Sequence, residues 1–597
     1  MSTAAEQFSL AHRLVEGGKG DEAREVLRGA LRAEPTHVES ILLLGRIEAE
    51  ARRHAEAEAV VRRGIELVPN SYALHVNLGV ILSTQRREQE AEHEFREALR
   101  LNPSLVLARY NLSKAIKRLF RLDEAIELLK QAVSLEPSFA AGHFDLANGL
   151  LDQGRGNEAL DSFRAALALK PGDAMYSKNY LMALNYVMSD PAMVLAEHRA
   201  YGDAVIARRP PCRPHQNDRN PDRKLRVGIL SGDLRQHSCS YFLEPLLAAM
   251  DRSAFEVICY CNHSTEDAVT ARLRTQSDAW RSVWKVATDA ADEMIRSDQV
   301  DVLVECSGLT DQSRLDIMAA KPAPVQGTYL GYPNTTGLST IDFRVVDSIS
   351  DPPALPGVPG GSDMRCVERL ARIDPCAWCY RPDRNAPPVS PPPFQERGRI
   401  TFGSFNNLAK FSHAVVDLWA RVLIRSPGTR LLLKNRWIGD AATAERVRKR
   451  FKACGVDPDR IEAAPYTDGV REHLAAYSRV DIQLDTFPYH GTTTTCESFW
   501  QGVPVVTLTG GVHAARVSSS LLHAVGLPEL APESPKGFVD AAVALAQDHQ
   551  RLADIRSRLR GMMERSPLRD ESAFARRFGS MVRSEFARWC AAPGRAG

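Results

Sequence analysis

The first third of the chain repeats a pattern of apolar and small residues with a period of 34 residues. Four residue types return together at this step. They are a leucine (Leu10, Leu44, Leu78, Leu112, Leu146), an alanine (Ala23, Ala57, Ala91, Ala125, Ala159), a second small residue (Ala30, Gly64, Ala98, Ala132, Ala166) and a proline (Pro35, Pro69, Pro103, Pro137, Pro171). The leucine and the small residues predict two closely packed helices per repeat, and the proline predicts the end of the second helix. We expect five helix pairs over about residues 4–173, followed by a sixth, degenerate pair through about residue 207.

The period and the residue types resemble the tetratricopeptide repeat, whose helix pairs stack into a superhelix. A fifth series, Asn77, Asn111, Asp145 and Asn179, keeps the same step just before the leucine of the first helix. In such solenoids this position faces the concave surface, where an amide offers a donor and an acceptor to an extended peptide. We interpret these four residues as candidate acceptor-binding groups. The alternative is that they are polar residues that only face solvent.

The pattern changes after residue 207. A Pro- and charge-rich stretch predicts a linker at 208–223, and apolar strand-like runs then alternate with helix-like segments. A second Pro-rich stretch, at 381–398, interrupts this alternation before it resumes. We therefore predict a repeat domain at 1–207, an α/β lobe at 224–390, and a second α/β lobe with C-terminal helices at 391–597. Ligands bind at the carboxyl ends of parallel strands, so the cleft between the lobes is the expected site.

Composition narrows the class of protein. The 597 residues are 44% hydrophobic and 25% charged, which is typical of a globular protein, and the net charge of +2 gives no reason to expect nucleic acid or a membrane surface as partner. No apolar run approaches the ~18 residues of a membrane span, and the first residues lack the pattern of a signal peptide. The 11 cysteines include one C-x-x-C pair, Cys376 and Cys379, without a second pair to complete a zinc site. We expect a cytoplasmic protein with reduced thiols.

One segment, HGTTTTCESFW, has the features of a phosphate-binding helix start. Gly491 permits close backbone approach, and Thr492 to Thr495 precede a helix-like run, where hydroxyls and free backbone amides bind phosphate. Paired carboxylates at D-x-D spacing can hold a metal ion beside a phosphate, but the pair of Asp457 and Asp459 lies in a predicted surface turn. We therefore expect no metal and no cofactor. A bound phosphate group would be stabilised by a helix N-terminus and cations instead.

Five segments together resemble the catalytic domain of O-GlcNAc transferases and the related SPINDLY proteins. They are VGILSGDLRQHSCSYFL, QGTYLGYPNTTG, FGSFNNLAKFS, VDIQLDTFPYHGTTTTCESFWQGVPVVTL and HAARVSSSLL, within about residues 224–590. The resemblance implies a GT-B fold behind a repeat superhelix that holds protein acceptors, in part through an asparagine ladder. It also implies metal-independent, inverting transfer of GlcNAc from UDP-GlcNAc onto Ser or Thr.

The resemblance assigns roles to single residues. The expected donor-binding residues are Lys410 and Asn407 near the phosphates, Gly491 and Thr492 to Thr494 (Thr493 and Thr494 on the diphosphate), Glu497 on the ribose, His473 beside the base, and Tyr332, Pro333 and Thr336 in the sugar pocket. His237 is expected in the active site, as proton acceptor or as a group that positions the acceptor, because its ordinary pKa near 6.5 suits proton transfer. Asp233 is the other candidate there, and Arg516 is expected to support the second lobe or the donor.

Two departures from the family bear on the donor. Leu309 stands in SGLT where bacterial relatives commonly have SGHT, and Ala476 stands where the family has an arginine. The same fold with another donor therefore remains open: GDP-fucose, as in SPINDLY proteins, or a nonulosonic acid transferred to flagellin in bacteria. A further alternative is a non-catalytic repeat scaffold. Lys410, His237 and the threonine-rich helix start argue against it.

Overall fold

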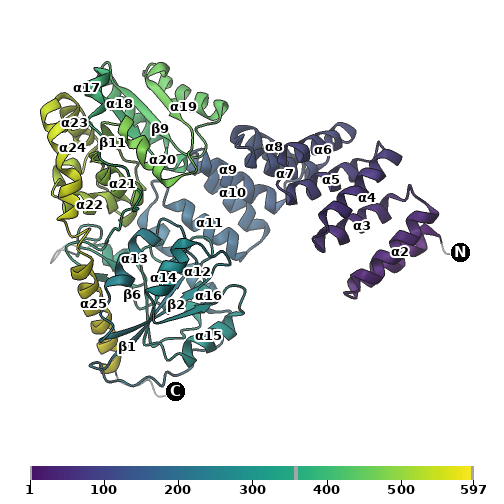
Figure 1. Ribbon diagram of the computed structural model, residues 1–597, viewed down its shortest axis with the longest axis horizontal. Helices are drawn as coiled ribbons and strands as arrows, with labels where there is room; N and C mark the ends of the chain where they lie inside the picture. The colour runs from purple at the N-terminus through teal and green to yellow at the C-terminus, as the bar shows by residue number, and fades with distance from the viewer. Residues whose placement is uncertain (1–2, 355–360, 593–597) are drawn as a thin grey trace. The chain divides into compact units, whose positions relative to one another are not determined.

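The computed structural model describes residues 3–354 and 361–592, which form two compact units (Figure 1). The first unit contains residues 1–153, 161–171 and 440–443, and the second contains the remainder. Among the described residues, no helix is both long and apolar enough to cross a membrane.

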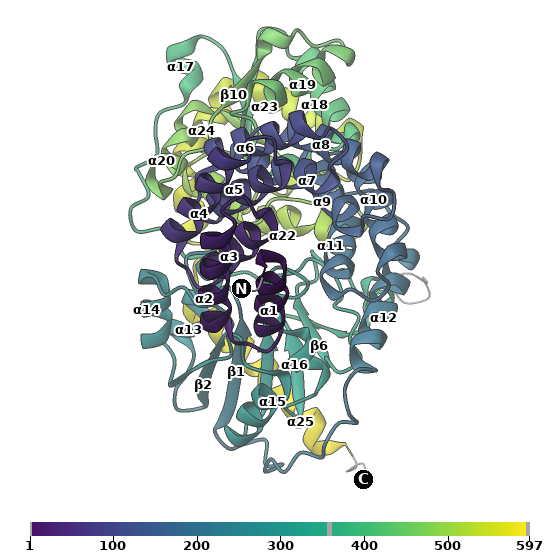
Figure 2. The ribbon, with the colours of Figure 1, turned by 90° about the vertical axis from the view of Figure 1, so that its right-hand side faces the viewer.

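The first unit is built from antiparallel helix pairs that follow one another in chain order (Figure 2). The helices are α1 (Ala4–Glu16), α2 (Gly20–Ala33), α3 (Val38–Glu50), α4 (His54–Leu67), α5 (Tyr72–Thr84), α6 (Glu88–Leu101), α7 (Val106–Arg118), α8 (Leu122–Leu135), α9 (Ala140–Asp152) and α10 (Gly156–Leu169). Each second helix ends two residues before a proline of the 34-residue series. The five predicted helix pairs are therefore confirmed.

The repeated residues pack where their sizes require. Ala57 and Ala91 are completely buried, and a Cβ added to Gly79 would lie 2.6 Å from the ring of Phe95. The small residues let neighbouring helices approach, and the phenylalanine fills the groove between them. Leu10 differs from the other leucines of its series because it is 42% exposed. It belongs to the first described repeat, so no helix pair described before it covers its side chain.

The helix pair α11 (Ala174–Leu184) and α12 (Pro191–Ile206) belongs to the second unit. The sequence predicts this pair as the cap of the repeats, but the structure packs it against the first α/β lobe. A Cβ on Gly202 would lie 1.9 Å from the carbonyl oxygen of Gly337, so the two backbones touch here. Lys178 Nζ donates a hydrogen bond of 2.7 Å to Ser313 Oγ in the same lobe. The pair is therefore part of the α/β unit.

The N-terminal lobe contains a parallel sheet of seven strands in the order β3-β2-β1-β4-β5-β6-β7. The strands are β1 (Leu225–Ser231), β2 (Phe255–Cys261), β3 (Ala279–Ser282), β4 (Val302–Glu305), β5 (Val325–Thr328), β6 (Phe343–Val346) and β7 (Arg369–Arg372). The helices between them are α13 (Ser240–Ala249), α14 (Ala268–Thr275), α15 (Thr288–Ser297) and α16 (Leu315–Ala319). The central strands are almost wholly buried apolar runs, as expected of a parallel sheet covered on both faces.

The C-terminal lobe contains a parallel sheet of five strands in the order β10-β9-β8-β11-β12. The strands are β8 (Thr401–Ser404), β9 (Arg430–Lys434), β10 (Ile461–Ala464), β11 (Ile482–Leu484) and β12 (Val505–Val506). Its helices are α17 (Pro393–Arg397), α18 (His413–Arg425), α19 (Ala441–Ala453), α20 (Val470–Ala475), α21 (Thr493–Trp500), α22 (Val517–Val525), α23 (Pro535–Gln547) and α24 (His549–Glu564). Two parallel-sheet lobes confirm the predicted α/β architecture of GT-B type.

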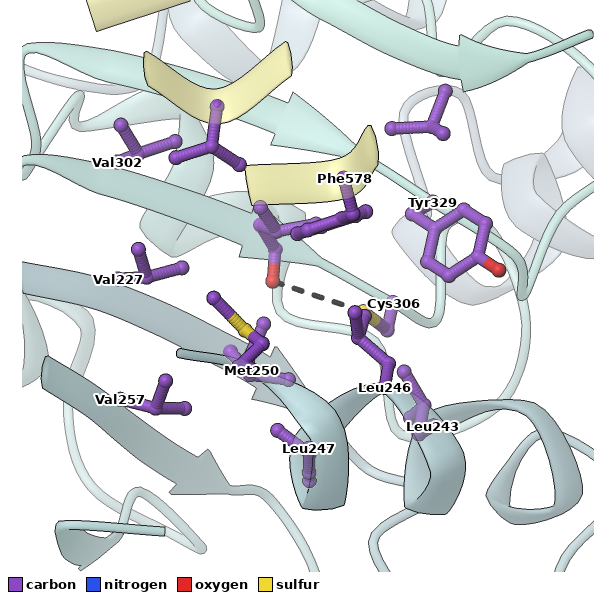
Figure 3. Close-up of a cluster of buried hydrophobic side chains, with 14 of the residues drawn as sticks. Val227, Leu243, Leu246, Leu247, Met250, Val257, Val302, Cys306, Tyr329 and Phe578 are labelled. Carbon is purple, nitrogen blue, oxygen red and sulfur yellow. Dashed lines mark hydrogen bonds between the residues drawn. The ribbon is translucent and has the colours of Figure 1, made fainter. Parts of the chain in front are cut away.

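The last helix, α25 (Glu571–Ala591), returns to the N-terminal lobe although it follows the C-terminal lobe in sequence (Figure 1). Phe574, Phe578 and Phe586 are completely buried in the same cluster as Val227 of β1 and Val302 of β4. Figure 3 shows Phe578 of this helix close to the valines of the sheet and to Tyr329. The helix ties the two lobes together through the core of the first.

Candidate active site

The loop after β11 is organised by one buried carboxylate. Asp485 accepts hydrogen bonds from the Gly491 amide (2.9 Å), from Asn406 Nδ2 (3.2 Å) and from Thr507 Oγ1 (2.8 Å). A Cβ on Gly491 would lie 2.8 Å from Thr495 Oγ1, so the backbone passes too close for any larger residue. The carboxylate therefore fixes the point at which the chain enters the next helix.

That helix is α21, whose first turn is threonine-rich. Thr492 is the N-cap, and its side chain makes no capping hydrogen bond. Thr493 and Thr494 are half-buried, whereas Thr495 is buried and bonds to Ser518 Oγ at 2.9 Å. The first two threonines thus retain accessible surface beside the N-terminal amides of the helix. A helix start of this kind attracts an anion because its amides have no partner within the helix.

Lys410 lies next to the same loop. Its Nζ donates to the His490 carbonyl at 2.6 Å and sits 4.1 Å from the centre of the Tyr489 ring. Burial lowers the pKa of Lys410 to about 8, partly offset by the nearby Asp485 carboxylate. The carbonyl that holds the ammonium immediately precedes Gly491, so the cation and the start of α21 form one local feature. A full positive charge and free backbone amides are the groups that proteins use to bind anions.

Asn407 is exposed and lies three residues before Lys410. Its Oδ1 accepts the Ala409 amide at 3.1 Å and begins the 3₁₀ turn that carries the lysine. The contact gives Asn407 a role in shaping this turn, and its predicted contact with phosphate stays a prediction.

A second polar cluster joins His473 and Glu497, which the sequence predicts for the base and the ribose. His473 Nε2 lies 3.2 Å from Glu497 Oε2, and its Nδ1 lies 2.8 Å from Lys434 Nζ. The lysine ammonium can only donate, so Nδ1 accepts and Nε2 carries the proton that it gives to Glu497. The Tyr477 hydroxyl also donates to Glu497 at 3.3 Å, and Phe405 packs 4.5 Å from the Tyr477 ring. The cluster combines donors, an acceptor and aromatic faces.

Lys434 is the member of this cluster that the sequence analysis missed. Burial lowers its pKa, partly offset by Glu497. It is the last residue of β9, so it stands at the carboxyl edge of the sheet, where ligands of parallel sheets bind. The sequence could have indicated Lys434, because a charged residue directly follows the apolar run Leu431 to Leu433.

His237 and Asp233 follow β1 in the N-terminal lobe. The His237 side chain is 36% exposed, and its Nδ1 lies 3.4 Å from Asp233 Oδ1. Nδ1 also accepts the Cys239 amide at 3.3 Å. Burial lowers the pKa of His237 and raises the pKa of Asp233. The imidazole is therefore neutral at neutral pH, the form in which it accepts a proton.

The predicted sugar-pocket residues Tyr332 and Thr336 are buried, with their hydroxyls already occupied. Tyr332 Oη lies 2.7 Å from His198 Nε2 on α12 and accepts from Asn185 Nδ2 at 3.0 Å. The Thr336 hydroxyl donates to Glu368, which also accepts the Thr336 amide at 2.7 Å. These contacts hold the α11–α12 pair and a loop in place, and the lining of a sugar pocket by Tyr332 and Thr336 stays a prediction.

Pro333 lines a cavity of about 50 Å³ within the second unit, together with Asn185, Arg344 and His513. Arg516 donates to the Ile349 carbonyl at 2.7 Å and to the Gly510 carbonyl at 2.9 Å, and so joins the two lobes. This contact agrees with the supporting role expected for Arg516.

The four ladder residues lie on first helices of their pairs. Asn77, Asn111 and Asp145 are half-buried on α5, α7 and α9 of the first unit. Asn77 Oδ1 is buried without a hydrogen-bond partner, so an acceptor there remains unsatisfied. Asn179 lies on α11 of the second unit and donates to the Met175 carbonyl at 2.9 Å. Their binding of acceptor chains stays a prediction.

Comparison with known proteins agrees with these features. Residues 200–357 and 396–578 match glycosyl transferase family 41, and residues 8–72, 72–105 and 118–183 match tetratricopeptide repeats. A protein of Petunia hybrida named "Probable UDP-N-acetylglucosamine--peptide N-acetylglucosaminyltransferase SPINDLY" is 40% identical over 69% of the chain and 44% of its own length. The relative named SEC from Arabidopsis thaliana is 30% identical over 62% of the chain and 37% of its length.

Among solved structures, that of a mutant O-GlcNAc transferase from Thermobaculum terrenum is similar with a TM-score of 0.78 and 32% identity, over 87% of this chain and 99% of that one. The chain spans less than half the length of the curated relatives that it matches.

Proposed function

The chain belongs to glycosyl transferase family 41, and on that premise we propose that it transfers GlcNAc from UDP-GlcNAc onto serine or threonine of protein acceptors. The observation that carries the proposal is the anion site formed by Lys410 and the start of α21. The ammonium is held by the His490 carbonyl at 2.6 Å, directly before the glycine that leads into the threonine-rich turn.

The chemistry requires stabilisation of a departing nucleoside diphosphate. As the bond from the anomeric carbon to the diphosphate breaks, negative charge grows on the phosphate oxygens. A buried ammonium and free helix amides are fixed before the reaction, so they need no reorganisation when this charge appears. The proposed reaction uses no metal. The acceptor hydroxyl attacks the anomeric carbon from the opposite face and inverts its configuration.

The acceptor hydroxyl must lose its proton during the attack. A neutral His237 with a lowered pKa is a suitable acceptor, and Asp233 at 3.4 Å stabilises the imidazolium that results. We assign His237 to proton transfer or to positioning of the acceptor, with Asp233 as its partner. On the donor side, Glu497 accepts the ribose hydroxyls, and His473 with Lys434 borders the base.

Protein acceptors are proposed to bind along the repeats, through Asn77, Asn111 and Asp145 in the first unit. These residues offer amide or carboxylate groups at one repeat's spacing. Flagellin is one candidate acceptor. The 11 cysteines are all free thiols, which is compatible with the cytoplasmic location that we propose.

A second candidate keeps the fold and changes the donor. The higher identity to proteins named SPINDLY (40%) than to the one named SEC (30%) favours a test of GDP-fucose. Leu309, which is 3% exposed, replaces a polar residue common in bacterial relatives and removes a hydrogen-bonding group near the N-terminal lobe's cleft edge. A nonulosonic acid is the third donor class to include.

A thermal-shift panel of UDP-, GDP- and CMP-sugars tests the donor. A ligand that binds only the folded chain stabilises it by about 2.7 kcal/mol at a hundredfold excess over Kd. We expect UDP-GlcNAc to raise the Tm and GDP-fucose to leave it unchanged. A rise with GDP-fucose alone contradicts the proposed donor and leaves the fold assignment untouched. No rise with any nucleotide sugar favours the non-catalytic scaffold.

A further inference from the structure

Three side chains with different metal-binding atoms lie close together in the segment that follows β1 in the N-terminal lobe. Asp233, His237 and Cys239 each direct one ligand atom into the same space, and these atoms all lie within 4.8 Å of one another. Asp233 and Cys239 are 4% and 9% exposed, while His237 is partly open to solvent. The proposed transfer reaction uses His237 and Asp233, but Cys239 has no role in it.

The distance between the nitrogen ligand of His237 and the oxygen ligand of Asp233 suits a tetrahedral metal ion. Metal–oxygen and metal–nitrogen bonds of about 2.0 Å place two such ligand atoms about 3.3 Å apart. His237 Nδ1 and Asp233 Oδ1 are 3.4 Å apart. The competing contact at Nδ1 is the Cys239 amide at 3.3 Å, which is long for a hydrogen bond and which a metal at Nδ1 would replace.

A second observation points to a missing ligand. Asp233 is only 4% exposed, and its buried Oδ2 accepts no hydrogen bond from a nitrogen or a hydroxyl; the donor beside the carboxylate is the Cys239 thiol, which metal binding would deprotonate. An unpaired buried carboxylate oxygen is costly, and a cation bound in the cluster would satisfy it. Further negative charge comes from Asp311 and Glu305, and Arg235 opposes it.

We propose that Asp233, His237 and Cys239 form a binding site for Zn²⁺ or a similar thiophilic divalent cation, and that its occupation inhibits transfer. One carboxylate, one imidazole and one thiolate are the donor set of Zn²⁺ sites, with a fourth position left to water. Binding exchanges the Cys239 thiol proton for a metal–sulfur bond and releases the proton to solvent. The metal takes the lone pair of His237 and the charge of Asp233, which the transfer step needs. The inhibitory part rests on the proposed function of His237, whereas the site itself does not.

The site is tested first without any substrate. The whole chain, stripped of metals with a chelator, is titrated with Co²⁺ as a spectroscopic substitute for Zn²⁺. We expect one equivalent to produce a thiolate-to-cobalt charge-transfer band in the near ultraviolet, and Zn²⁺ to remove it. The band should disappear in Cys239→Ser and in Cys239→Ala and weaken in Asp233→Asn. Cys212→Ser is the matched control, because Cys212 is exposed and its Sγ lies 4.0 Å from His215 Nε2, which makes a cysteine–histidine pair outside the cluster.

The consequence is tested by inhibition of transfer, with each variant normalised to its own metal-free activity. Loss of one of three ligands should raise the Zn²⁺ concentration for half inhibition by at least about tenfold, the lower end of the effect of losing even an outer-sphere partner. A Co²⁺ band that is absent from the native chain, or equally strong in both folded Cys239 variants, overturns the site. A band that depends on Cys239, combined with identical Zn²⁺ inhibition in native chain and variants, overturns the inhibitory role. If no donor supports transfer, the proposed function fails, and the Co²⁺ spectrum still decides the site.

Discussion

The two α/β lobes use their most recognisable motifs for different purposes. In the C-terminal lobe, the threonines that open α21 are half-buried and keep accessible surface, and the Lys410 ammonium lies beside the loop that leads into that helix. In the N-terminal lobe, the hydroxyls of Tyr332 and Thr336 are buried and consumed by contacts with His198, Asn185 and Glu368. A motif that identifies a family therefore contains residues that hold the scaffold as well as residues that face the ligand. Burial and hydrogen-bond partners separate the two kinds.

The sharpest test of the C-terminal lobe is Lys410→Met, which keeps the length of the side chain and removes its charge. Removal of one fixed group that stabilises transition-state charge lowers kcat by about 10²–10³-fold. We expect that loss in a steady-state transfer assay, with binding of acceptor protein retained. Lys449→Met is the matched control because Lys449 is exposed on α19. Unchanged transfer by Lys410→Met would remove Lys410 from the mechanism.

Glu497→Gln tests the cluster of His473, Glu497 and Tyr477, and its expected effect is smaller than that of Lys410→Met. The substitution keeps the shape but removes the charge that accepts from His473 and Tyr477. A hydrogen bond to a charged group contributes about 1.5–3 kcal/mol, or roughly 10–150-fold in affinity. We expect KM for the nucleotide sugar to rise within that range and kcat to change little. A fall in kcat at constant KM would instead place Glu497 in the chemical step.

The pH dependence of kcat/KM tests the protonation state of Lys410. Its pKa of about 8 in the folded chain predicts that kcat/KM falls above pH 8, by about tenfold per pH unit, as the ammonium loses its proton. The free energy of unfolding changes in the opposite direction. Below pH 8 the buried charge of Lys410 lowers it, and this cost disappears as the pH rises from 8 to 10.5, the ordinary pKa of a lysine. Lys410→Arg should lose the fall above pH 8 in whatever activity remains. A fall at the same pH in that variant would assign it to another group.

Tyr332→Phe tests whether the N-terminal motif holds the scaffold. The change removes the hydroxyl between His198 and Asn185 and leaves two buried polar groups without it. We expect unfolding free energy to fall by about 1–3 kcal/mol in denaturant titration, with the donor KM within about twofold of native. Tyr466→Phe, at a 56% exposed position, should leave stability unchanged. A large rise in donor KM with unchanged stability would instead support the predicted sugar-pocket role of Tyr332.

The smallest expected effect concerns the repeats. Replacing Asn77 and Asn111 together with alanine removes two adjacent groups of the proposed ladder. We expect KM to rise a few-fold for protein acceptors and not for short peptides, because a short peptide does not reach along the repeats. Equal effects on both acceptor classes would contradict the ladder.

Sequence predicts most of the fold because its signals are local. Each proline of the 34-residue series lies two residues after a helix, and the threonine run opens α21 as expected. The misses are contacts between segments distant in sequence. Lys434 joins His473 from 39 residues away, Tyr332 meets His198 from 134 residues away, and α25 returns to the first lobe. Neither residue type nor periodicity predicts which distant residue forms a hydrogen bond with a given hydroxyl or ammonium group.

The central claim is that this chain adds GlcNAc to proteins, and intact-mass spectrometry tests it most directly. Candidate acceptors, flagellin included, are incubated with UDP-GlcNAc and either the native chain or Lys410→Met. The account predicts that native enzyme adds whole multiples of one N-acetylhexosamine residue, and that the variant adds almost none. Addition of a deoxyhexose or a nonulosonic acid from its own donor, with no N-acetylhexosamine from UDP-GlcNAc, would contradict it.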